Sequence, residues 1–327
     1  MTTVFGIFLL TLLLVTAVGI LRARDLFAAV MLSGIYSLQI AAVFFVLDAA
    51  DVALTEAAVG AGVATVLMLG ALALITREER AATGPRWLAL AVVALTTLLV
   101  VYATFEQPRL GDPGAPVHRH VAPWYLAETA RLIDVPNVVT AILATFRGYD
   151  TLGELFVIFT AGIGVMFILA VPREPRNGEE PSIEGAGLRH HLIPRVVGRL
   201  LVPFIVLFGL YVQFHGDYGP GGGFQAGALI AAGLILHALI EGESAALRAV
   251  HRNVLLGLIA GGALLYTAVG IAGMLLGGPF LDYSVLRTDP VAGQHLGILL
   301  VELGVGMTVT GVLLTIFHAF AARASVR

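Results

Sequence analysis

Residues 4–21, with the sequence VFGIFLLTLLLVTAVGIL, form an uninterrupted apolar stretch, and stretches of this kind recur along the whole chain. A helix needs about 20 mostly apolar residues to cross the hydrocarbon core of a bilayer. The first stretch has no basic leader and no small-residue cleavage site, so we expect a membrane span and not a signal peptide. The candidate spans are Val4–Leu21, Leu26–Leu47, Val52–Ile75, Arg86–Phe105, Leu152–Val171, Val196–Phe214, Phe224–Ile240, Val254–Leu276 and His295–His318. The sequence predicts an all-α, polytopic integral membrane protein with nine transmembrane helices.

The composition of the 327 residues excludes several classes of protein. Hydrophobic residues make up 58% and charged residues 13%, against about 25% charged in a typical soluble domain. Disordered chains, coiled coils and nucleic-acid-binding proteins are therefore excluded. The chain has no cysteine, and all 19 basic residues are arginine. Cysteine-ligated clusters, a Walker A loop and a Schiff-base lysine are excluded, and we expect neither a cofactor nor a metal site. Because the chain also has no recognisable nucleophile–base arrangement, we do not expect an enzyme.

The distribution of arginine predicts the orientation in the membrane. If the N-terminus lies outside and the C-terminus inside, most of the 19 arginines fall in inner segments, as the positive-inside rule requires. The outer segments then hold only Arg109, Arg119, Arg131, Arg147 and Arg287. We therefore expect the N-terminus outside and the C-terminus inside.

Two polar breaks divide the chain. Residues 106–136 are rich in proline and predict an outer loop, in which Trp124–Ile133 favours an amphipathic segment at the membrane interface. After Asn137, a plausible helix cap, Val138–Phe146 is too short to span and favours a re-entrant or lateral helix. The proline- and charge-rich stretch Pro172–Pro194 predicts an inner linker between two units.

Ionisable residues inside spans are functional candidates, because such a group costs at least about 2.5 kcal/mol at mid-membrane. Glu56 lies in the segment DVALTEAAVG, which begins at Asp51, and small residues around it leave room for water or a partner helix. We favour Asp51 and Glu56 as ion-path residues. A glutamate whose carboxylate lies in headgroup water is the alternative interpretation of Glu56.

A second acidic group lies at the entrance of the fifth span. Asp150 and Glu154 are four residues apart and share a helical face, and Arg147 lies seven residues before Glu154 on the same predicted stripe. This pattern is typical of a proton or cation relay. Acids that simply stabilise the start of a helix through its dipole are the alternative.

Glu302 is the deepest acid of the predicted spans, and His295 lies two helical turns before it on the same face. Both groups can titrate near neutrality once burial raises the carboxyl pKa. The pair predicts a proton relay, with a buried hydrogen bond that closes the helix bundle as the alternative.

The segment HGDYGPGGGF, residues 215–224, joins the sixth and seventh spans. Consecutive glycines allow positive φ, and we expect the exposed amides and carbonyls of this loop to line a cavity at membrane depth. Its candidate ion-path residues are His215 and Asp217, and its structural residues are Pro220, Gly221, Gly222, Gly223 and Phe224. A simple re-entrant turn is the alternative. The 38 glycines of the chain also predict close packing of helices.

Three of these motifs resemble subunits of Mrp-type multisubunit cation/proton antiporters. Residues 51–69 resemble the C-terminal region of the large MrpA protein and the D-type component of membrane-bound hydrogenases. The segment FRGYDTLGE, residues 146–154, is similar to MrpA and to the E-type hydrogenase component, and PGGGF, residues 220–224, to the Mrp B-type and F-type hydrogenase components. The Mrp B-type proteins usually carry a histidine just before this run, where the chain has Asp217. His215 and Gln225 look like the hydrogenase-linked variant.

The resemblance implies a fusion of the MrpA tail with an MnhB-like unit. Its expected units are residues 1–105, an MrpA C-terminal or MbhD-like unit; 106–175, an outer loop and MbhE-like segment; 176–194, a cytoplasmic linker; and 195–327, an MnhB- or MbhF-like unit. It also implies a multi-pass component of an Mrp-type Na⁺/H⁺ antiporter in the cytoplasmic membrane. The expected partners are Na⁺, H⁺, the lipid bilayer and other membrane subunits, among them a large antiporter-like one.

Two alternatives to this function stay open. The same module could serve a group 4 hydrogenase or a related oxidoreductase, whose chemistry would lie on other subunits. It could also be a purely structural or lipid-sealing subunit.

Overall fold

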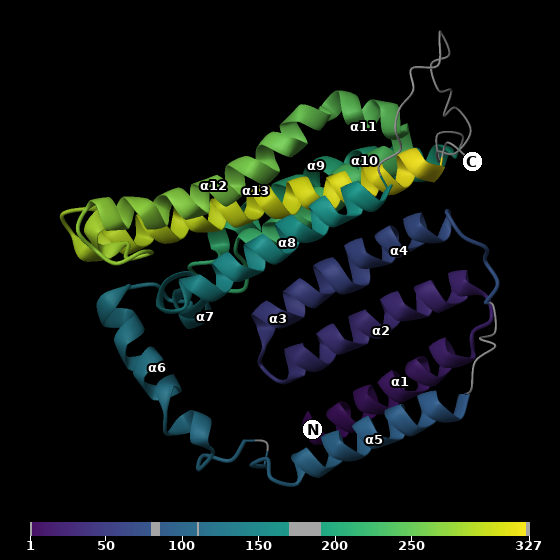
Figure 1. Cartoon of the computed structure of the whole chain (residues 1–327), viewed down its shortest axis with the longest axis horizontal. Coiled ribbons are helices and arrows are strands. Elements are labelled where there is room, and N and C mark those ends of the chain that lie inside the picture. Colours follow the sequence, from purple (N-terminus) through teal and green to yellow (C-terminus); the bar gives the residue numbers. More distant parts are fainter. Residues whose placement is uncertain (1, 80–85, 110, 170–190, 325–327) are drawn as a thin grey trace.

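The computed structural model describes residues 2–79, 86–109, 111–169 and 191–324, whose regular elements are all helices (Figure 1). Nine helices in these ranges are long and apolar enough to cross a membrane, which confirms the predicted number. They are α1 (Thr2–Arg22), α2 (Leu26–Val46), the continuous span α3–η1–α4 (Ala50–Leu72), α5 (Arg86–Thr104), α8 (Gly148–Leu169), α9 (Leu192–His215), α10 (Gly223–Glu241), α12 (Arg252–Leu275) and α13 (Pro290–Ala324). Of the predicted linker 172–194, residues 172–190 lie outside the described ranges, and residues 192–194 belong to α9.

Helix α13 is the centre of a bundle that α8, α10 and α12 surround, with α9 packed against α10 (Figure 1). Its buried residues follow the helical period, and they include Ile298, Val301, Val305 and Val309. The helix carries Glu302, which is half-buried, to the start of α10, where its carboxylate contacts Gly222 and Gly223.

Glycine lets the helices of the bundle approach each other closely, as the composition predicted. A Cβ built on Gly304 of α13 would lie 2.8 Å from the carbonyl oxygen of Gly262 of α12. A Cβ on Gly227 of α10 would lie 2.8 Å from the carbonyl oxygen of Gly306 of α13. Because both distances are shorter than real Cβ contacts, α10 and α12 can approach α13 this closely at these two points only through glycine.

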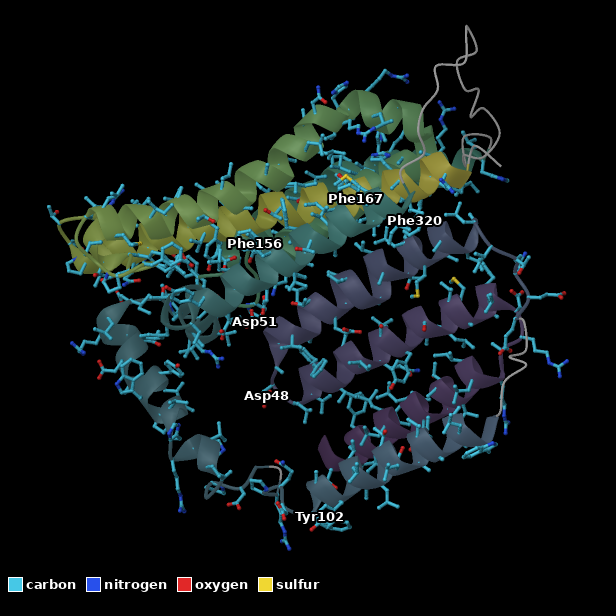
Figure 2. The ribbon with its side chains drawn as sticks, viewed as in Figure 1. Asp48, Asp51, Tyr102, Phe156, Phe167 and Phe320 are labelled. Carbon is cyan, nitrogen blue, oxygen red and sulfur yellow. The ribbon has the colours of Figure 1, made fainter. Side chains whose placement is uncertain are left out.

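The N-terminal helices form a second layer. Helix α1 packs on α2, α2 packs on the span Ala50–Leu72, and that span contacts α10 and α13. One contact joins Gly70 to Phe320, which Figure 2 labels on α13, with a Gly70 Cβ position 3.3 Å from the Phe320 Cβ. Helix α5, by contrast, buries none of its span against the described residues.

Two short helical segments connect α5 to the bundle. Helix α6 (Val121–Leu132) covers the predicted amphipathic segment, and the helical turn α7 (Val138–Thr140) continues into the π-helix η3 (Ala141–Phe146). Asn137 caps α7 as predicted, because its side-chain oxygen accepts the Val139 N–H at 3.0 Å. These segments lie at the end of the bundle opposite the C-terminus (Figure 1), and we call this end the α7 end.

A short helical segment (α11, Glu243–Ala249) lies at the opposite end, between α10 and α12. There the carboxylate of Glu241, the last residue of α10, accepts hydrogen bonds from Arg199 of α9 at 2.5 and 2.9 Å. This pair fixes α9 to α10 far from the α7 end.

Candidate functional site: carboxylates around a glycine loop

The glycine loop, residues 216–222, joins α9 to α10 at the α7 end of the bundle. Gly222 has a φ of 117°, a conformation open to glycine and closed to residues with a Cβ. A Cβ on Gly221 would lie 2.6 Å from the carbonyl oxygen of Val212. The predicted need for glycine is confirmed at these two positions, by a positive φ in one and a close approach in the other.

Side chains at the start of α7 hold the loop from one side. Asn137 Nδ2 donates to the carbonyl oxygens of Gly216 and Gly219 at 3.0 and 2.9 Å, and Thr140 Oγ1 donates to Gly216 at 2.7 Å. The backbone N–H of Asn137 donates to the carbonyl oxygen of Asp217 at 3.0 Å. The expectation that loop carbonyls line a cavity is therefore wrong for these three oxygens, because each is already bonded to the α7 segment.

The amide groups of the loop face carboxylates from two other spans. Gly221 N–H donates to Asp51 Oδ1 of α3 at 3.2 Å, and Gly223 N–H donates to Glu302 Oε2 of α13. Figure 2 shows Asp51 at the start of its span, on the side of the α7 end of the bundle. Both acids thus lie at the N-terminus of α10, where the helix dipole favours negative charge.

Asp217 in the loop is the third acid of this group, and the fields of Asp51 and Asp217 both reach Glu302. We call Asp51, Asp217 and Glu302 the carboxylate cluster. Burial raises the pKa of Asp217 above its usual value, and the nearby His295 lowers it in part.

The predicted relay between His295 and Glu302 requires a correction. His295 Nε2 donates to the backbone carbonyl of Ile133 at 2.9 Å, and the described hydrogen bonds include none between His295 and Glu302. The chain around Ile133 folds back onto α13 and offers a backbone acceptor, which sequence spacing along one helix does not reveal. His295 therefore belongs with Asp217, while Glu302 belongs with the start of α10.

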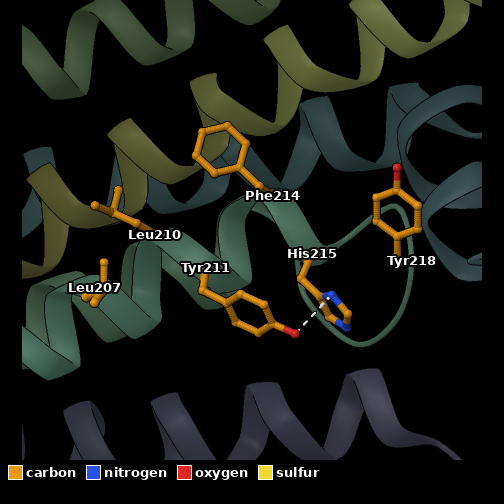
Figure 3. Close-up of a pocket in the computed structure, with 6 residues that line it drawn as sticks. All are labelled: Leu207, Leu210, Tyr211, Phe214, His215 and Tyr218. Carbon is orange, nitrogen blue, oxygen red and sulfur yellow. Dashed lines mark hydrogen bonds between the residues drawn. The ribbon is translucent and has the colours of Figure 1, made fainter.

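His215 lies on the surface of α9. Its ring stacks on Tyr211 with centroids 4.9 Å apart, and the Tyr211 hydroxyl lies 3.2 Å from its Nδ1 (Figure 3). With Tyr218 and three apolar residues of α9 these rings line an open hollow of about 480 Å³. No hydrogen bond of the described residues joins His215 to the carboxylate cluster.

Glu56 is placed apart from the cluster, on the face of its span that meets α2. It begins the π-helix η1 (Glu56–Ala64), and its carboxylate covers Gly60, one turn further on. The hydroxyl of Ser37 lies 3.0 Å from the Cβ position of Gly60, so a polar side chain of α2 lies at the same point. π-Helical segments are rare and frequent at functional sites, and the sequence analysis did not predict η1.

Asp150 and Glu154 lie on the exposed surface of α8. Arg147 Nε contacts Asp150 Oδ2 at 2.6 Å, with the two side chains 58% and 48% exposed. The prediction that Arg147 and Glu154 share one helical face is wrong. Arg147 is the C-cap of η3, with a φ of −126°, and lies before the start of α8. An exposed acid on a span needs another chain, water or headgroups beside it.

Two buried tyrosines, which the sequence analysis missed, join α12 and the loop before α13 to the α7–α8 segment. Tyr266 donates to the carbonyl oxygen of Gly148 and Tyr283 to that of Ala144, each at 2.9 Å. Both side chains are fully buried. The only signal in the sequence was general, namely that a tyrosine in an apolar span needs a partner for its hydroxyl.

Within the described ranges, no three His, Cys, Asp or Glu side chains converge to hold a metal ion. The carboxylate cluster offers a different chemistry. Its carboxyl groups can bind and release protons, and the Gly221 and Gly223 amides donate hydrogen bonds to two of them.

Three family models match the chain in succession. The first two describe the D-type and E-type components of MBH, over residues 11–77 and 88–183. The third is described as "Domain related to MnhB subunit of Na+/H+ antiporter" and matches residues 193–315. The resemblance to D- and E-type segments followed by a B-type unit is thereby confirmed.

Individual proteins agree with these models. A putative antiporter subunit mnhB2 of Staphylococcus aureus (strain Newman) is 34% identical over 128 residues, 38% of this chain and 90% of that protein. A probable K⁺/H⁺ antiporter protein of the A/B type from Rhizobium meliloti (strain 1021) is 28% identical over 226 residues, 63% of this chain and 22% of that protein. In the structure of the Mrp complex from Dietzia sp. DQ12-45-1b, one chain superposes with a TM-score of 0.75 and 29% identity, over 96% of this chain and 34% of that one.

The fold and the comparisons define a multi-pass membrane protein related to antiporter subunits. Through its C-terminal unit, the chain belongs to the family of MnhB subunits of Na⁺/H⁺ antiporters. It spans about a fifth of the Rhizobium meliloti protein and about a third of the solved Mrp chain.

Proposed function

We propose that the chain is an ion-translocating component of an Mrp-type antiporter, which exchanges Na⁺ for H⁺ across the cytoplasmic membrane. In this proposal the N-terminus lies outside and the C-terminus inside, and the partners are other membrane subunits, including a large antiporter-like one. The proposal is supported by the MnhB relatives and by the likeness to the Mrp chain over almost the whole length.

One observation in the site carries this function. Asp51 and Glu302, from two different spans, accept hydrogen bonds from Gly221 in the glycine loop and Gly223 at the start of α10. A carboxylate there can bind and release a proton, and the amides donate hydrogen bonds to its ionised form. The oxygens of the same group suit a hard cation, so a proton and Na⁺ would compete for one site.

The other candidate residues extend this site. His295 lies beside Asp217 of the cluster and would pass protons to or from it. Glu56 is a separate carboxylate deeper in the N-terminal layer, and Asp150 and Glu154 are exposed on α8, where another membrane subunit would cover them. His215 is a less direct candidate, because its ring faces the hollow on α9.

The test is Glu302→Gln in the assembled complex, since glutamine preserves the shape of the side chain and removes its titration. Inverted membrane vesicles would be assayed for Na⁺-dependent proton movement, with the amount of assembled complex measured in parallel. We expect loss of Na⁺-dependent flux at normal assembly. Thr310→Val is a matched control on the same helix, because it removes the 3.2 Å hydrogen bond to the Gly227 carbonyl and no charge. Normal flux in Glu302→Gln would contradict the proposed site.

A redox-driven complex is the second candidate function, and the two MBH family models favour it. Mass spectrometry of the gently solubilised complex, captured through this chain, separates the two. If only antiporter-type membrane subunits are captured, the result supports the antiporter. If nickel–iron or iron–sulfur subunits are captured, it supports the redox-driven assembly.

A further inference from the structure

Gln213, two residues before the end of α9, carries a buried amide group whose nitrogen has no partner among the described residues. The residue is 8% exposed, and Nε2 is buried without a hydrogen-bond acceptor. Leaving such a donor unsatisfied costs the full desolvation penalty of the group. Buried polar groups without a protein partner are generally bonded to ordered water.

The Gln213 amide packs on the turn of α13 that follows Glu302. The Gln213 side-chain oxygen packs on the Cα of Gly306, and the Gly223 carbonyl oxygen lies 3.3 Å from the Cβ position of the same glycine. Gly306 follows Glu302 by one helical turn of α13, and Glu302 binds the Gly223 amide. Gln213 and Gly223 therefore both contact Gly306, and Glu302 contacts the same Gly223, where α9, α10 and α13 converge beneath the glycine loop.

The hydrogen-bonding capacity of Gln213 Nε2 determines which ligand it can bind. Nε2 is a donor, so it needs an acceptor and cannot coordinate a cation. A water molecule can accept from Nε2 and at the same time donate to the Glu302 carboxylate, which satisfies both groups.

We propose that an ordered water molecule bridges Gln213 Nε2 and the Glu302 carboxylate, and that Gln213 is a positioning residue for proton exchange at Glu302. When a proton reaches the free lone pair of this water, the water passes one of its own protons to the carboxylate. The products are neutral water and a protonated Glu302, so the water is regenerated. The inference rests on the proposed function and adds to it the route by which Glu302 is protonated.

The first test is a high-resolution cryo-EM map of the whole wild-type complex. We expect water density within about 2.7–3.2 Å of both Nε2 and a carboxylate oxygen of Glu302. A map in which Nε2 bonds directly to a protein acceptor, or has no density beside it, overturns the inference.

The second test is the pH profile of Na⁺-dependent proton flux in Gln213→Leu, which keeps a similar volume and removes the donor. We expect the midpoint of the profile to move by about one pH unit at normal assembly, because the variant no longer positions the water that protonates Glu302. A purely structural role would lower the amount of complex and leave the midpoint in place. Thr310→Val is again the control.

The outcomes separate this inference from the proposed function. An unchanged midpoint in Gln213→Leu, with Glu302→Gln inactive, overturns the role of Gln213 and leaves the antiporter site intact. Normal flux in Glu302→Gln removes the site itself.

Discussion

Glu302 of α13 and Gly223, the first residue of α10, are joined through both side chain and backbone. The Glu302 carboxylate accepts the Gly223 N–H, and the Glu302 backbone carbonyl packs directly on the Gly223 Cα. The glycine thus does two things: it lets α10 touch α13, and it aims an amide at the carboxylate. The PGGGF motif is in this respect a contact surface for an acid on another helix.

Gly223→Ala should therefore disrupt the contact between α10 and α13. A Cβ at this position would collide with the Glu302 carbonyl and lie 2.9 Å from the backbone nitrogen of Gly306. Overpacking of this kind costs about 1–3 kcal/mol. We expect less assembled complex and a lower unfolding temperature, measured by native gels and thermal unfolding of the solubilised complex.

Gly164→Ala in α8 is the matched control, because no atom lies within 4 Å of its Cβ position. An alanine in a helix is favoured over glycine by about 1 kcal/mol, so this variant should be as stable as the wild type or more so. Equal stability of the two alanine variants would contradict the described contact.

Tyr266→Phe and Tyr283→Phe should each destabilise the chain. Each change leaves a buried carbonyl oxygen, of Gly148 or Ala144, without its donor, at a cost of about 1–3 kcal/mol. The two hydroxyls also converge, 3.7 and 3.4 Å from the Cβ position of Gly148. The loss of stability in the double variant should therefore differ from the sum of the losses in the two single variants.

Thermal unfolding of the purified complex measures this loss. Tyr102→Phe in α5 is the control (Figure 2). Tyr102 is 65% exposed, and surface substitutions usually change the free energy of unfolding by no more than about 0.5 kcal/mol. If Tyr266→Phe and Tyr283→Phe both unfold at the same temperature as Tyr102→Phe, these hydrogen bonds do not hold the α7–α8 segment in place.

The sequence was sufficient to predict the nine spans and the class of the protein. Apolar length decides a span, so Val4–Leu21 and the other stretches could be found without knowledge of packing. The cap at Asn137 was also local and was predicted. The π-helices η1 and η3 were missed, because their backbone pairing depends on neighbouring helices and leaves no period in the sequence.

The site was less predictable, because its contacts join distant segments. Glu302 was found as a buried acid, but its partner, the Gly223 amide, lies 79 residues away. Asn137 was expected only as a cap, yet it also binds two loop carbonyls 79 and 82 residues away. Helical spacing predicted His295 as the partner of Glu302, and tertiary structure gave His295 the Ile133 carbonyl instead.

The stability of the complex should depend on pH through Asp217. Burial raises the pKa of this carboxyl above 3.8 in the folded chain, so the stabilisation by its protonated form is complete below pH 3.8 and is lost as pH rises through the raised pKa. Asp217→Asn stays uncharged at every pH. Its unfolding temperature relative to the wild type should therefore increase as pH rises from 3.8 through the raised pKa of Asp217.

The measurement is thermal unfolding of both complexes across this pH range. Asp289→Asn is the control for the loss of a negative charge, because Asp289 is exposed directly before α13. A wild-type complex that gains stability relative to Asp217→Asn as pH rises would show that the ionised carboxylate is stabilised in the fold, against this expectation.

Glu56→Gln should lower Na⁺-dependent proton flux at normal assembly, because it removes a titratable group from the contact between η1 and α2 and keeps the side-chain shape. Asp48→Asn is the matched control, since Asp48 is an exposed acid just before the same span and asparagine tolerates its φ of 59°. The assay is Na⁺-dependent proton movement in inverted vesicles. Because no hydrogen bond of the described residues joins Glu56 to the carboxylate cluster, the comparison with Glu302→Gln is informative. Loss in both variants indicates that ions pass through both layers of the chain, whereas normal flux in Glu56→Gln alone restricts the path to the carboxylate cluster.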